Sequence, residues 1–397
     1  MFKIIHTSDW HLGQTFHQYD RTEEFRFFLD QLYDIISEEK PDALCISGDI
    51  FDSMAPGLAS QRLWATALER LSSLDNEMDI IAIAGNHDSG SKLEVYSHIF
   101  KDNIHIIGKK PEILKLKSKD GDEAVVCAVP YIPGSFYRNY LSEEERNNED
   151  DSMKTFFRSI AAKAEKLRLS EDIPLILLAH TAVTGSDFRG QDEYKFNFND
   201  VNVIGKDFDY VALGHIHLPQ TIREGISTVR YCGAPMAMGF DEDYPHSVTV
   251  ATFHNGVTEL RQAGLKEFRL PITLFKEDPL KAPDVKKFLR KYKPRKKQYL
   301  RIYYHDDGNF TVEHRLLLES AFADNEEVKL CLILPVIPSE TDPMIRDIKE
   351  KELIPDNISM FDPLDIARRY FIQKKNVEMP EHLVCLLKSA IYEDSQD

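Results

Sequence analysis

Side chains of metal-binding types stand at five places in the first 220 residues, each directly after an apolar run. The clusters are Asp9-Trp10-His11, Gly48-Asp49-Ile50-Phe51-Asp52, Gly85-Asn86-His87-Asp88, His180 and Gly214-His215-Ile216-His217. Carboxylate, amide and imidazole ligands without a thiolate suit Mn²⁺, Fe²⁺ or Zn²⁺ in an open site better than a closed structural zinc. Two such ions, roughly 4 Å apart, activate water and stabilise the charge of an in-line phosphoryl transition state. The residue types therefore predict a binuclear metal site for phosphoryl chemistry.

The apolar runs that precede the clusters have the length and composition of buried strands. They cover residues 2–7, 43–46, 80–84, 174–179 and 209–213. Because ligands collect at the carboxyl ends of strands in an open α/β sheet, we expect the clusters to meet at one mouth. Asp49 is the natural bridge between two ions. On an extended chain Asp9 and His11 point to the same side and reach one ion, whereas His215 and His217 either share an ion or diverge.

His87 stands beside Asn86 but has no evident ligand role. Its expected task is that of general acid for the leaving oxygen, or stabiliser of transition-state charge. A single buried histidine is more often a hydrogen-bonded core residue than a ligand, and each glycine before a cluster could simply end a strand. The conjunction of five clusters, each after an apolar strand, favours the metal site.

These motifs, in this order, resemble the signature of the calcineurin-like metallophosphoesterases. Three longer stretches are similar to the SbcD family, the nuclease subunits of the bacterial SbcC and SbcD hairpin nuclease. They are residues 6–14 (HTSDWHLGQ), 212–217 (ALGHIH) and 230–235 (RYCGAP). The resemblance is specific over residues 1–270 and beyond that rests on length and element order.

The resemblance implies a ligand set for each of two divalent ions, of which Mn²⁺ is favoured over Fe²⁺ or Mg²⁺. The first ion takes Asp9, His11, Asp49 and His217, and the second takes Asp49, Asn86, His180 and His215. His87 takes the catalytic position that does not bind metal. Asp52 replaces a histidine of archaeal relatives, and it either orients a ligand or caps the helix that follows.

The resemblance also implies a DNA nuclease. The expected activities are 3'-to-5' exonuclease action on duplex ends and endonuclease cleavage of hairpins and single strands, in DNA repair and recombination. The expected partners are DNA, the SbcC ATPase and a second copy of the chain, which together form a heterotetramer; Leu63 and Leu68 are one place to look for the dimer surface. No G-x-x-x-x-G-K-[ST] motif occurs in the sequence, so any dependence on ATP must come from a partner.

Composition limits the class of protein. The 397 residues are 42% apolar and carry a net charge of −17, which at first argues against a nucleic-acid partner. Nucleic-acid binding depends on where the basic groups lie, and eight of the twelve residues from 286 to 297 are lysine or arginine. Such a run is also typical of a solvated face. Five scattered cysteines and the lack of a signal peptide or long apolar segment predict a soluble, cytoplasmic, nucleoid-associated protein with reduced thiols and no membrane contact.

We expect an α/β protein with a four-layer α/β/β/α sandwich, a small α+β capping domain and a C-terminal helical tail. The predicted boundaries are 1–270 for the nuclease domain, 271–337 for the capping domain and 338–397 for a tail that binds a partner or folds back. Helices are expected at 20–38, 58–74, 91–100, 152–169, 283–291 and 311–323. The first begins with a capping box of Asp20 and Glu23, and the tail has two helical stretches, near 363–372 and 380–392.

Three further expectations concern the sheets and loops. The second sheet is expected to begin at residue 104, because short β-rich runs start there. Runs between 227 and 261 alternate like an antiparallel meander. The polar segment 184–199 is long enough to cover the metal site, and structureless loops of that length tend to be functional.

Two other functions fit parts of the pattern. A calcineurin-like phosphatase or cyclic-nucleotide phosphodiesterase would use the same metal site on a small substrate, but it does not need the additional domain, the basic run or the apolar tail. A non-catalytic scaffold would retain the fold and lose the chemistry. That alternative predicts a missing His87 or missing ligands, and all are present.

Overall fold

The computed structural model describes most of the chain up to Val336. The described residues are 1–75, 77–97, 99–100, 103–147, 151–189, 191, 200–204, 207–223, 227–336, 380 and 383–384. The chain divides into two compact units, Met1–Tyr304 with Thr311–Leu334 and His305–Phe310 with Pro335–Asp397. Most of the second unit, including the two predicted tail helices, lies outside the described residues. The first unit carries the fold.

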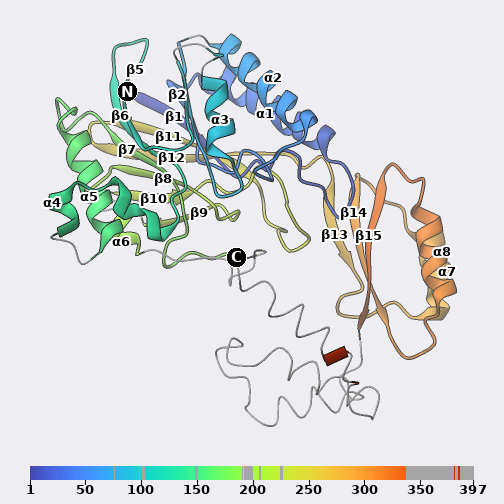
Figure 1. The fold of residues 1–397 in the computed structure, drawn as a ribbon. Helices are drawn as coiled ribbons and strands as arrows, with labels where there is room; N and C mark the ends of the chain where they lie inside the picture. The colour runs from blue at the N-terminus through green and yellow to red at the C-terminus, as the bar shows by residue number, and fades with distance from the viewer. Residues whose placement is uncertain are drawn as a thin grey trace. The chain divides into compact units, whose positions relative to one another are not determined.

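Two six-stranded sheets form the centre of this unit (Figure 1). The first has the order β12-β11-β1-β2-β3-β4. Its strands are β1 (Phe2–Thr7), β2 (Ala43–Ile46), β3 (Asp79–Ile83), β4 (Ile104–Ile107), β11 (Ser247–His254) and β12 (Val257–Gly264). Strands β1 to β4 are parallel, and the β11–β12 hairpin pairs antiparallel with β1.

The second sheet has the order β5-β6-β7-β8-β10-β9. Its strands are β5 (Glu112–Lys117), β6 (Glu123–Val129), β7 (Leu175–His180), β8 (Tyr210–Gly214), β9 (Gln220–Arg223) and β10 (Thr228–Tyr231). Strands β6, β7, β8 and β10 are parallel to one another, with antiparallel β5 and β9 at the edges. Two parallel strands of this sheet, β7 and β8, therefore end beside the predicted clusters at His180 and His215.

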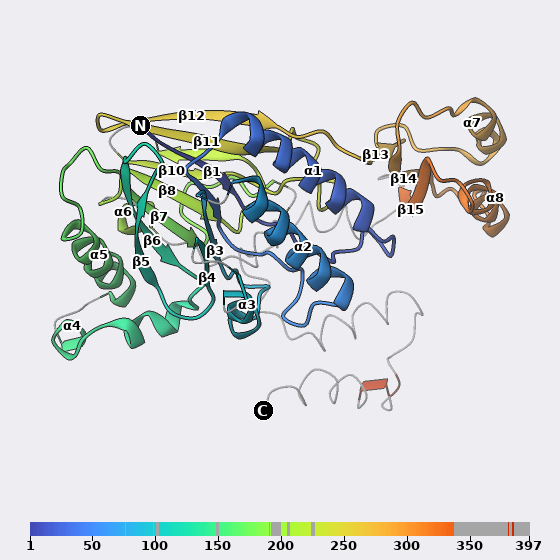
Figure 2. The same cartoon turned by 90° about the horizontal axis from the view of Figure 1, so that it is seen from above.

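Three hydrophobic clusters divide the unit into four layers. One packs the outer face of the first sheet against α1 (Thr22–Glu39) and α2 (Leu58–Leu74), which lie next to each other in Figure 2. The middle cluster joins the inner faces of the two sheets, for example through Ile81 and Ile176. The third packs the second sheet against α5 (Ser152–Glu165). Successive residues such as Ile4 and Ile5 belong to different clusters, as the period of a strand requires. The predicted α/β/β/α sandwich is confirmed.

The shorter helices extend these two outer layers. They are α3 (Gly90–Ser97), α4 (Glu143–Asn147), α6 (Val201–Ile204) and the 3₁₀ segment η1 (Gly134–Tyr140). No helix within the described ranges is long and apolar enough to cross a membrane. Helix α5 ends at Glu165, four residues before its predicted end.

The first helix begins differently from the prediction. Its N-cap is Arg21, which makes no capping hydrogen bond through its side chain, and Asp20 instead accepts hydrogen bonds from the backbone and hydroxyl of Thr22. The capping-box prediction was wrong because Arg21 turns inward to the core side. Leu68 on α2 is fully buried, so the suggestion that it belongs to a dimer surface was wrong as well.

The sheet predictions need two corrections. Strand β4 completes the first sheet, because Ile104–Ile107 pairs parallel with β3, and the second sheet begins at β5. The predicted meander is divided between the sheets: β10 joins β8, whereas β11 and β12 return to β1. Local alternation identifies a strand but not its partner. Strand β9 and the strand at Leu270–Leu274 were not predicted.

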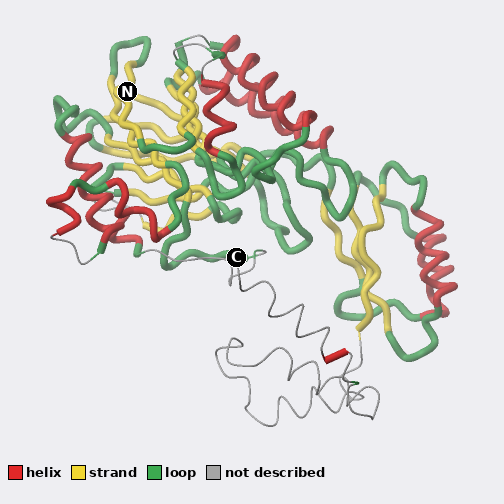
Figure 3. The backbone as a smooth tube through the Cα atoms, in the orientation of Figure 1, coloured by secondary structure: helices red, strands yellow, loops and turns green. Residues whose placement is uncertain are grey.

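A three-stranded sheet follows the sandwich, with order β13-β14-β15 and helices α7 and α8 on one face (Figure 3). Its elements are β13 (Leu270–Leu274), α7 (Val285–Lys291), β14 (Gln298–His305), α8 (Val312–Phe322) and β15 (Val328–Val336). Tyr299 of β14 stacks on Phe16 with ring centroids 4.1 Å apart, and its hydroxyl donates to Glu24 of α1. This small sheet occupies the predicted capping region, whose domain boundaries stay a prediction.

A buried histidine between the two sheets makes the fold sensitive to acid. His6 of β1 lies 2.9 Å from the Tyr210 hydroxyl and 3.1 Å from the Ser47 hydroxyl. Burial, and then the charge of Arg230, lower the pKa of His6 to about 3. Because the unfolded histidine titrates near 6.5, the unfolded state binds more protons between these values, and stability falls as pH falls.

We expect lowering the pH from 7.5 to 5.0 to cost about 2 kcal/mol of unfolding free energy through His6 alone. Urea unfolding in EDTA at both pH values measures this loss, since metal release then makes no contribution. His6→Gln should reduce the acid-dependent loss by that amount. The exposed control His254→Gln should not. An equal acid loss in His6→Gln and the wild type would show that other groups cause it.

Candidate metal centre

The loops that carry the five predicted clusters meet at the carboxyl ends of parallel strands from both sheets. The clusters follow β1, β2 and β3 in the first sheet and β7 and β8 in the second. A direct link joins the sheets at this edge, because His180 Nδ1 lies 2.7 Å from the carbonyl oxygen of Ser47. A carbonyl only accepts hydrogen bonds, so Nδ1 carries the proton and Nε2 has a free lone pair.

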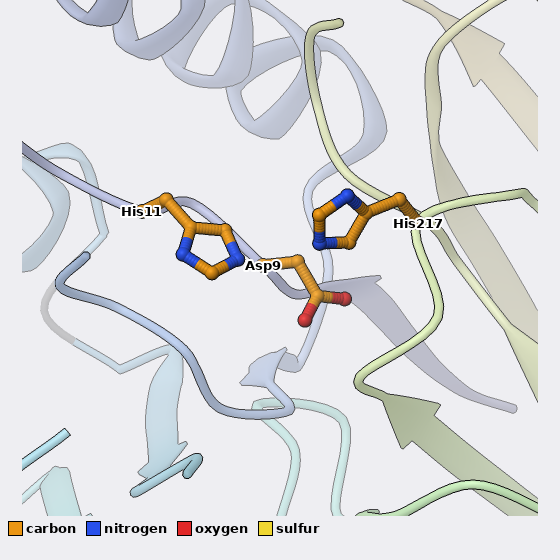
Figure 4. A group of neighbouring side chains, drawn as sticks. All are labelled: Asp9, His11 and His217. Carbon is orange, nitrogen blue, oxygen red and sulfur yellow. The ribbon is translucent and has the colours of Figure 1, made fainter. Parts of the chain in front are cut away.

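The first group of potential ligands consists of Asp9, His11 and His217. Their ligand atoms all lie within 4.8 Å of one another. Figure 4 shows both imidazole rings and the Asp9 carboxylate turned toward a common space. Both ring nitrogens of His11 are buried without a hydrogen-bond partner among the described residues, which a bound cation would supply. This geometry suits one divalent ion.

The second group consists of Asp49, His180 and His215, with ligand atoms within 4.8 Å of one another. His180 Nε2 lies 3.3 Å from Asp49 Oδ2 and 3.0 Å from Asn86 Oδ1. His215 and His217 thus diverge to different groups, which was one of the two arrangements left open.

Asp49 lies between the two groups. Its Oδ2 is 3.3 Å from His180 Nε2 and 3.7 Å from His11 Nε2, while its Oδ1 accepts the backbone N–H of His87. One carboxylate oxygen therefore faces a ligand from each group. This is the geometry that a bridging carboxylate needs.

The backbone at these residues is unusual. Asp9, His11, Asp49 and His215 all have positive φ, at 54°, 47°, 50° and 98°. The expectation that Asp9 and His11 lie on extended chain was wrong; two left-handed residues bring both side chains to the same group. Non-glycine residues with positive φ are uncommon and cluster at functional sites, where the surrounding structure holds them.

Two neighbours on the third strand's loop keep Asp49 in place. Asp88 is buried and accepts three backbone N–H groups, those of Ile50, Phe51 and Gly85. At Gly85 a Cβ atom would collide with the Asp49 carboxylate and backbone. The sequence motif contained both residues, but only the contacts reveal that they support the loop of Asp49.

His87 is exposed beside both groups, with its ring centroid 4.9 Å from that of His11. Its Nδ1 lies 2.9 Å from the carbonyl oxygen of Asp52. By the argument used for His180, Nδ1 carries a proton, and Nε2 is the nitrogen left to exchange one with a substrate. His11, Asp52 and His87 also form a third group with ligand atoms within 4.8 Å, so a ligand role for His87 has to be tested.

Asp52 does not cap the following helix, because α2 begins at Leu58 with Gly57 as its N-cap. Its Oδ1 lies 3.5 Å from His11 Nδ1 instead. Of the two expectations, capping was wrong, and orientation of a ligand agrees with this distance.

The charges of the metal-free site favour ionised carboxylates. Burial would raise the pKa of Asp49, but the charge and hydrogen bond of His180 hold it well below its usual range. Burial lowers the pKa of His180 and of His217, yet Asp49 and Glu242 respectively raise each to about 9. For His215, burial and then the charge of His180 lower the pKa to about 3.

Three more residues complete the surroundings, and sequence reasoning missed them. The Glu242 carboxylate lies 2.7 Å from His217 Nδ1. The exposed Tyr131 ring lies 6.3 Å and 6.5 Å, between centroids, from His180 and His215. The Gln191 side chain bonds the backbone of His215 and His217. Gln191 belongs to the segment expected to cover the site, of which 192–199 lie outside the described residues. No local pattern identifies these residues as part of the site.

Comparison with known proteins places this geometry in a family. The family model for calcineurin-like phosphoesterases matches residues 2–219, which include all seven predicted ligands and His87.

Three relatives are named as the SbcD component of the nuclease SbcCD. The Escherichia coli K12 protein is 30% identical over 292 residues, which cover 68% of this chain and 69% of the relative. The Bacillus subtilis protein is 30% identical over 289 residues, with coverage of 69% and 72%. The Rhodobacter capsulatus protein is 29% identical over 274 residues, with coverage of 64% and 67%. The chain therefore belongs to the calcineurin-like phosphoesterase family, and within it to the SbcD family of SbcCD nuclease components.

Proposed function

We propose that this chain is a metal-dependent DNA nuclease that hydrolyses phosphodiesters within a complex of the SbcC–SbcD type. Its activities would be 3'-to-5' exonuclease action on duplex ends and endonuclease cleavage of hairpins and single strands. The observation that carries the proposal is the convergence of two groups of ligand atoms on Asp49, with His87 exposed beside them. The names of the relatives support DNA as the substrate and an SbcC-type ATPase as the partner.

In this proposal the residues divide between two divalent ions, with Mn²⁺ favoured. Asp9, His11 and His217 hold the first, Asn86, His180 and His215 hold the second, and Asp49 bridges them. When bound, the ions supply an activated water and offset the negative charge of the phosphoryl transition state. His87 does not bind metal and transfers a proton from Nε2 to the leaving oxygen. The Asp52 carbonyl orients its ring.

The proposal includes the division into a nuclease domain (1–270), a capping domain (271–337) and a partner-binding tail (338–397). The capping region carries the basic run, and seven of its eight side chains are exposed. Within the described part of the chain, only Lys287 of this run has an acidic partner within 4 Å, at Asp284. A row of unpaired cations on an acidic protein suits contacts to phosphate that do not read sequence.

Neutralising four cations of α7 should weaken DNA binding and its salt dependence. The variant combines Lys286→Gln, Lys287→Gln, Arg290→Gln and Lys291→Gln. The slope of log K against log salt should become shallower by about 0.9 for each lost phosphate contact on duplex DNA. Fluorescence anisotropy with a labelled duplex at several salt concentrations measures this slope.

The matched control removes four exposed cations from α5. It combines Lys154→Gln, Arg158→Gln, Lys163→Gln and Lys166→Gln. It changes net charge equally, so a general electrostatic effect would appear in both variants. An unchanged slope in the α7 variant would mean that the basic run is only a solvated face.

The test of the nuclease proposal is cleavage of an end-labelled DNA hairpin with Mn²⁺ by the purified chain, alone and with its ATPase partner. A chromogenic phosphodiester is assayed in parallel. Incision of the hairpin that requires Mn²⁺ supports the proposal. Turnover of the small diester without DNA cleavage in either condition would favour the small-substrate phosphodiesterase. Activity on neither substrate would favour the scaffold. Light scattering of the same samples tests the proposed homodimer and heterotetramer.

A further inference from the structure

A carboxylate from outside the ligand set holds the ring of His217. Glu242 is 3% exposed, and its Oε1 lies 2.7 Å from His217 Nδ1. Its other oxygen, Oε2, accepts the backbone N–H of Met238 at 2.9 Å. Both carboxylate oxygens are therefore engaged, and the carboxylate is fixed in one orientation relative to the imidazole.

We propose that Glu242 is the positioning residue for His217 and that the capping sheet holds it in place through Arg301. An ionised carboxylate only accepts hydrogen bonds, so Nδ1 carries the proton and the lone pair of Nε2 faces Asp9 and His11. A partner of this kind fixes the ring and makes it a better donor to a metal. The inference rests on the proposed metal role of His217.

The loop that carries Glu242 is attached to the capping sheet at the two preceding residues. The Arg301 guanidinium of β14 donates to the Asp241 carboxylate at 2.8 Å and lies 4.8 Å from the centre of the Phe240 ring. Arg301 is only 11% exposed in its side chain and also donates to Thr273 of β13. The strand of the cap therefore grips residues 240 and 241, and the next residue grips the ligand.

The same loop is attached to the nuclease domain on its other side. Arg21 donates to the carbonyl oxygen of Ala237 at 2.8 Å, and Gln14 donates to that of Met238 at 3.3 Å. Arg21 also pairs with Glu24, which accepts the hydroxyl of Tyr299 from β14. Contacts from the cap thus reach both ends of the segment 237–242, and its conformation depends on the position of the cap.

The histidine of the other ligand group is supported differently. His180 Nδ1 bonds to the main-chain carbonyl of Ser47, at the end of strand β2 inside the sandwich. No side chain of the capping sheet takes part in that contact. A change in the loop of Glu242 should therefore weaken the first ion selectively and leave the second unaffected.

Calorimetric titration of the metal-free, full-length protein with Mn²⁺ measures the two binding events directly. Glu242→Ala should weaken one event about 10- to 100-fold, as is typical for loss of such a partner, and leave the other unchanged. Glu242→Gln keeps an oxygen acceptor and should have a smaller effect. The control Asp243→Asn removes a neighbouring, exposed carboxylate and should bind both ions as the wild type does. The unchanged second event also shows that each variant is folded.

Nitrogen NMR of histidine-labelled, metal-free protein gives a readout independent of metal. In the wild type the His217 signals should show Nδ1 protonated and hydrogen-bonded, and Glu242→Ala should lose this pattern. Arg301→Gln should weaken the same binding event several-fold, because Asp241 and Phe240 lose their contact with the cap. Unchanged affinity in Arg301→Gln would overturn the role of the cap.

One further variant separates this inference from the function on which it rests. His217→Asn should abolish one of the two binding events. If it leaves both intact, the ligand role of His217 fails, and the inference fails with it. If His217→Asn loses an event while Glu242→Ala binds both ions like the wild type, only the positioning role of Glu242 is overturned.

Discussion

Replacing His87 with glutamine should reduce the turnover of hairpin DNA about 10²- to 10⁴-fold, the usual contribution of a general acid. This corresponds to about 3 to 5 kcal/mol of transition-state stabilisation. Glutamine retains a polar side chain of similar reach but cannot transfer a proton at neutral pH. The backbone N–H of residue 87 still donates to Asp49, so the metal groups should keep their geometry. Single-turnover kinetics at saturating Mn²⁺ measure the loss.

The decisive companion measurement is the metal content of the His87→Gln protein. Calorimetry should detect both binding events with unchanged affinity, because neither group assigned to an ion includes His87. Loss of an ion would show instead that the group His11, Asp52 and His87 binds metal. The control His254→Gln replaces an exposed histidine at the opposite end of the sheet, beside Phe253, which pairs with Phe2. It should leave turnover and binding unchanged.

Replacing Asp49 with asparagine should have an effect of at least similar size through a different cause. The bridging position between His11 and His180 needs a charged oxygen, and an amide supplies neither the charge nor two equivalent oxygens. We expect at least one of the two Mn²⁺ binding events to disappear. Turnover should fall by about 10³-fold, equivalent to about 4 kcal/mol. Calorimetry and the hairpin assay measure the two consequences separately.

Asp52→Asn is the matched control for this experiment, since it makes the same chemical change three residues along the same loop. The Asp52 carboxylate approaches only His11, at 3.5 Å, so its loss should reduce affinity by about 10-fold or less. Full retention of both ions by Asp49→Asn would show that Asp49 does not bridge. Equal losses in the two variants would mean that charge in the loop matters more than contact with the ions.

Sequence alone predicted the architecture well where apolar periodicity is strong. The long runs before Asp9, Asp49 and Asn86 are strands in the structure, and the helix at Leu58–Leu74 has its predicted bounds. Such elements are determined by residues that are near one another in the chain. The predictions failed where a distant partner decides: β4 and the β11–β12 hairpin were assigned to the wrong sheet, and Asp20 does not cap its helix.

The types of residue at the metal centre were also readable from the sequence, because oxygen and nitrogen ligands at strand ends define what the site can bind. The way they converge was not. Asp9 and His11 reach a common point through two left-handed residues rather than by the alternation of a strand. Asp49 comes between the groups only because two separate sheets end at the same edge.

The sequence by itself determined the class of chemistry, since a set of Asp, Asn and His residues after parallel strands has few other uses. Only the tertiary structure decided which residues support that set. Glu242 follows its ligand His217 by 25 positions, and Arg301 follows Asp241 by 60. No local periodicity links residues so far apart. Their contacts depend on the packing of a loop between a sandwich and a capping sheet, and that packing is a property of the folded chain.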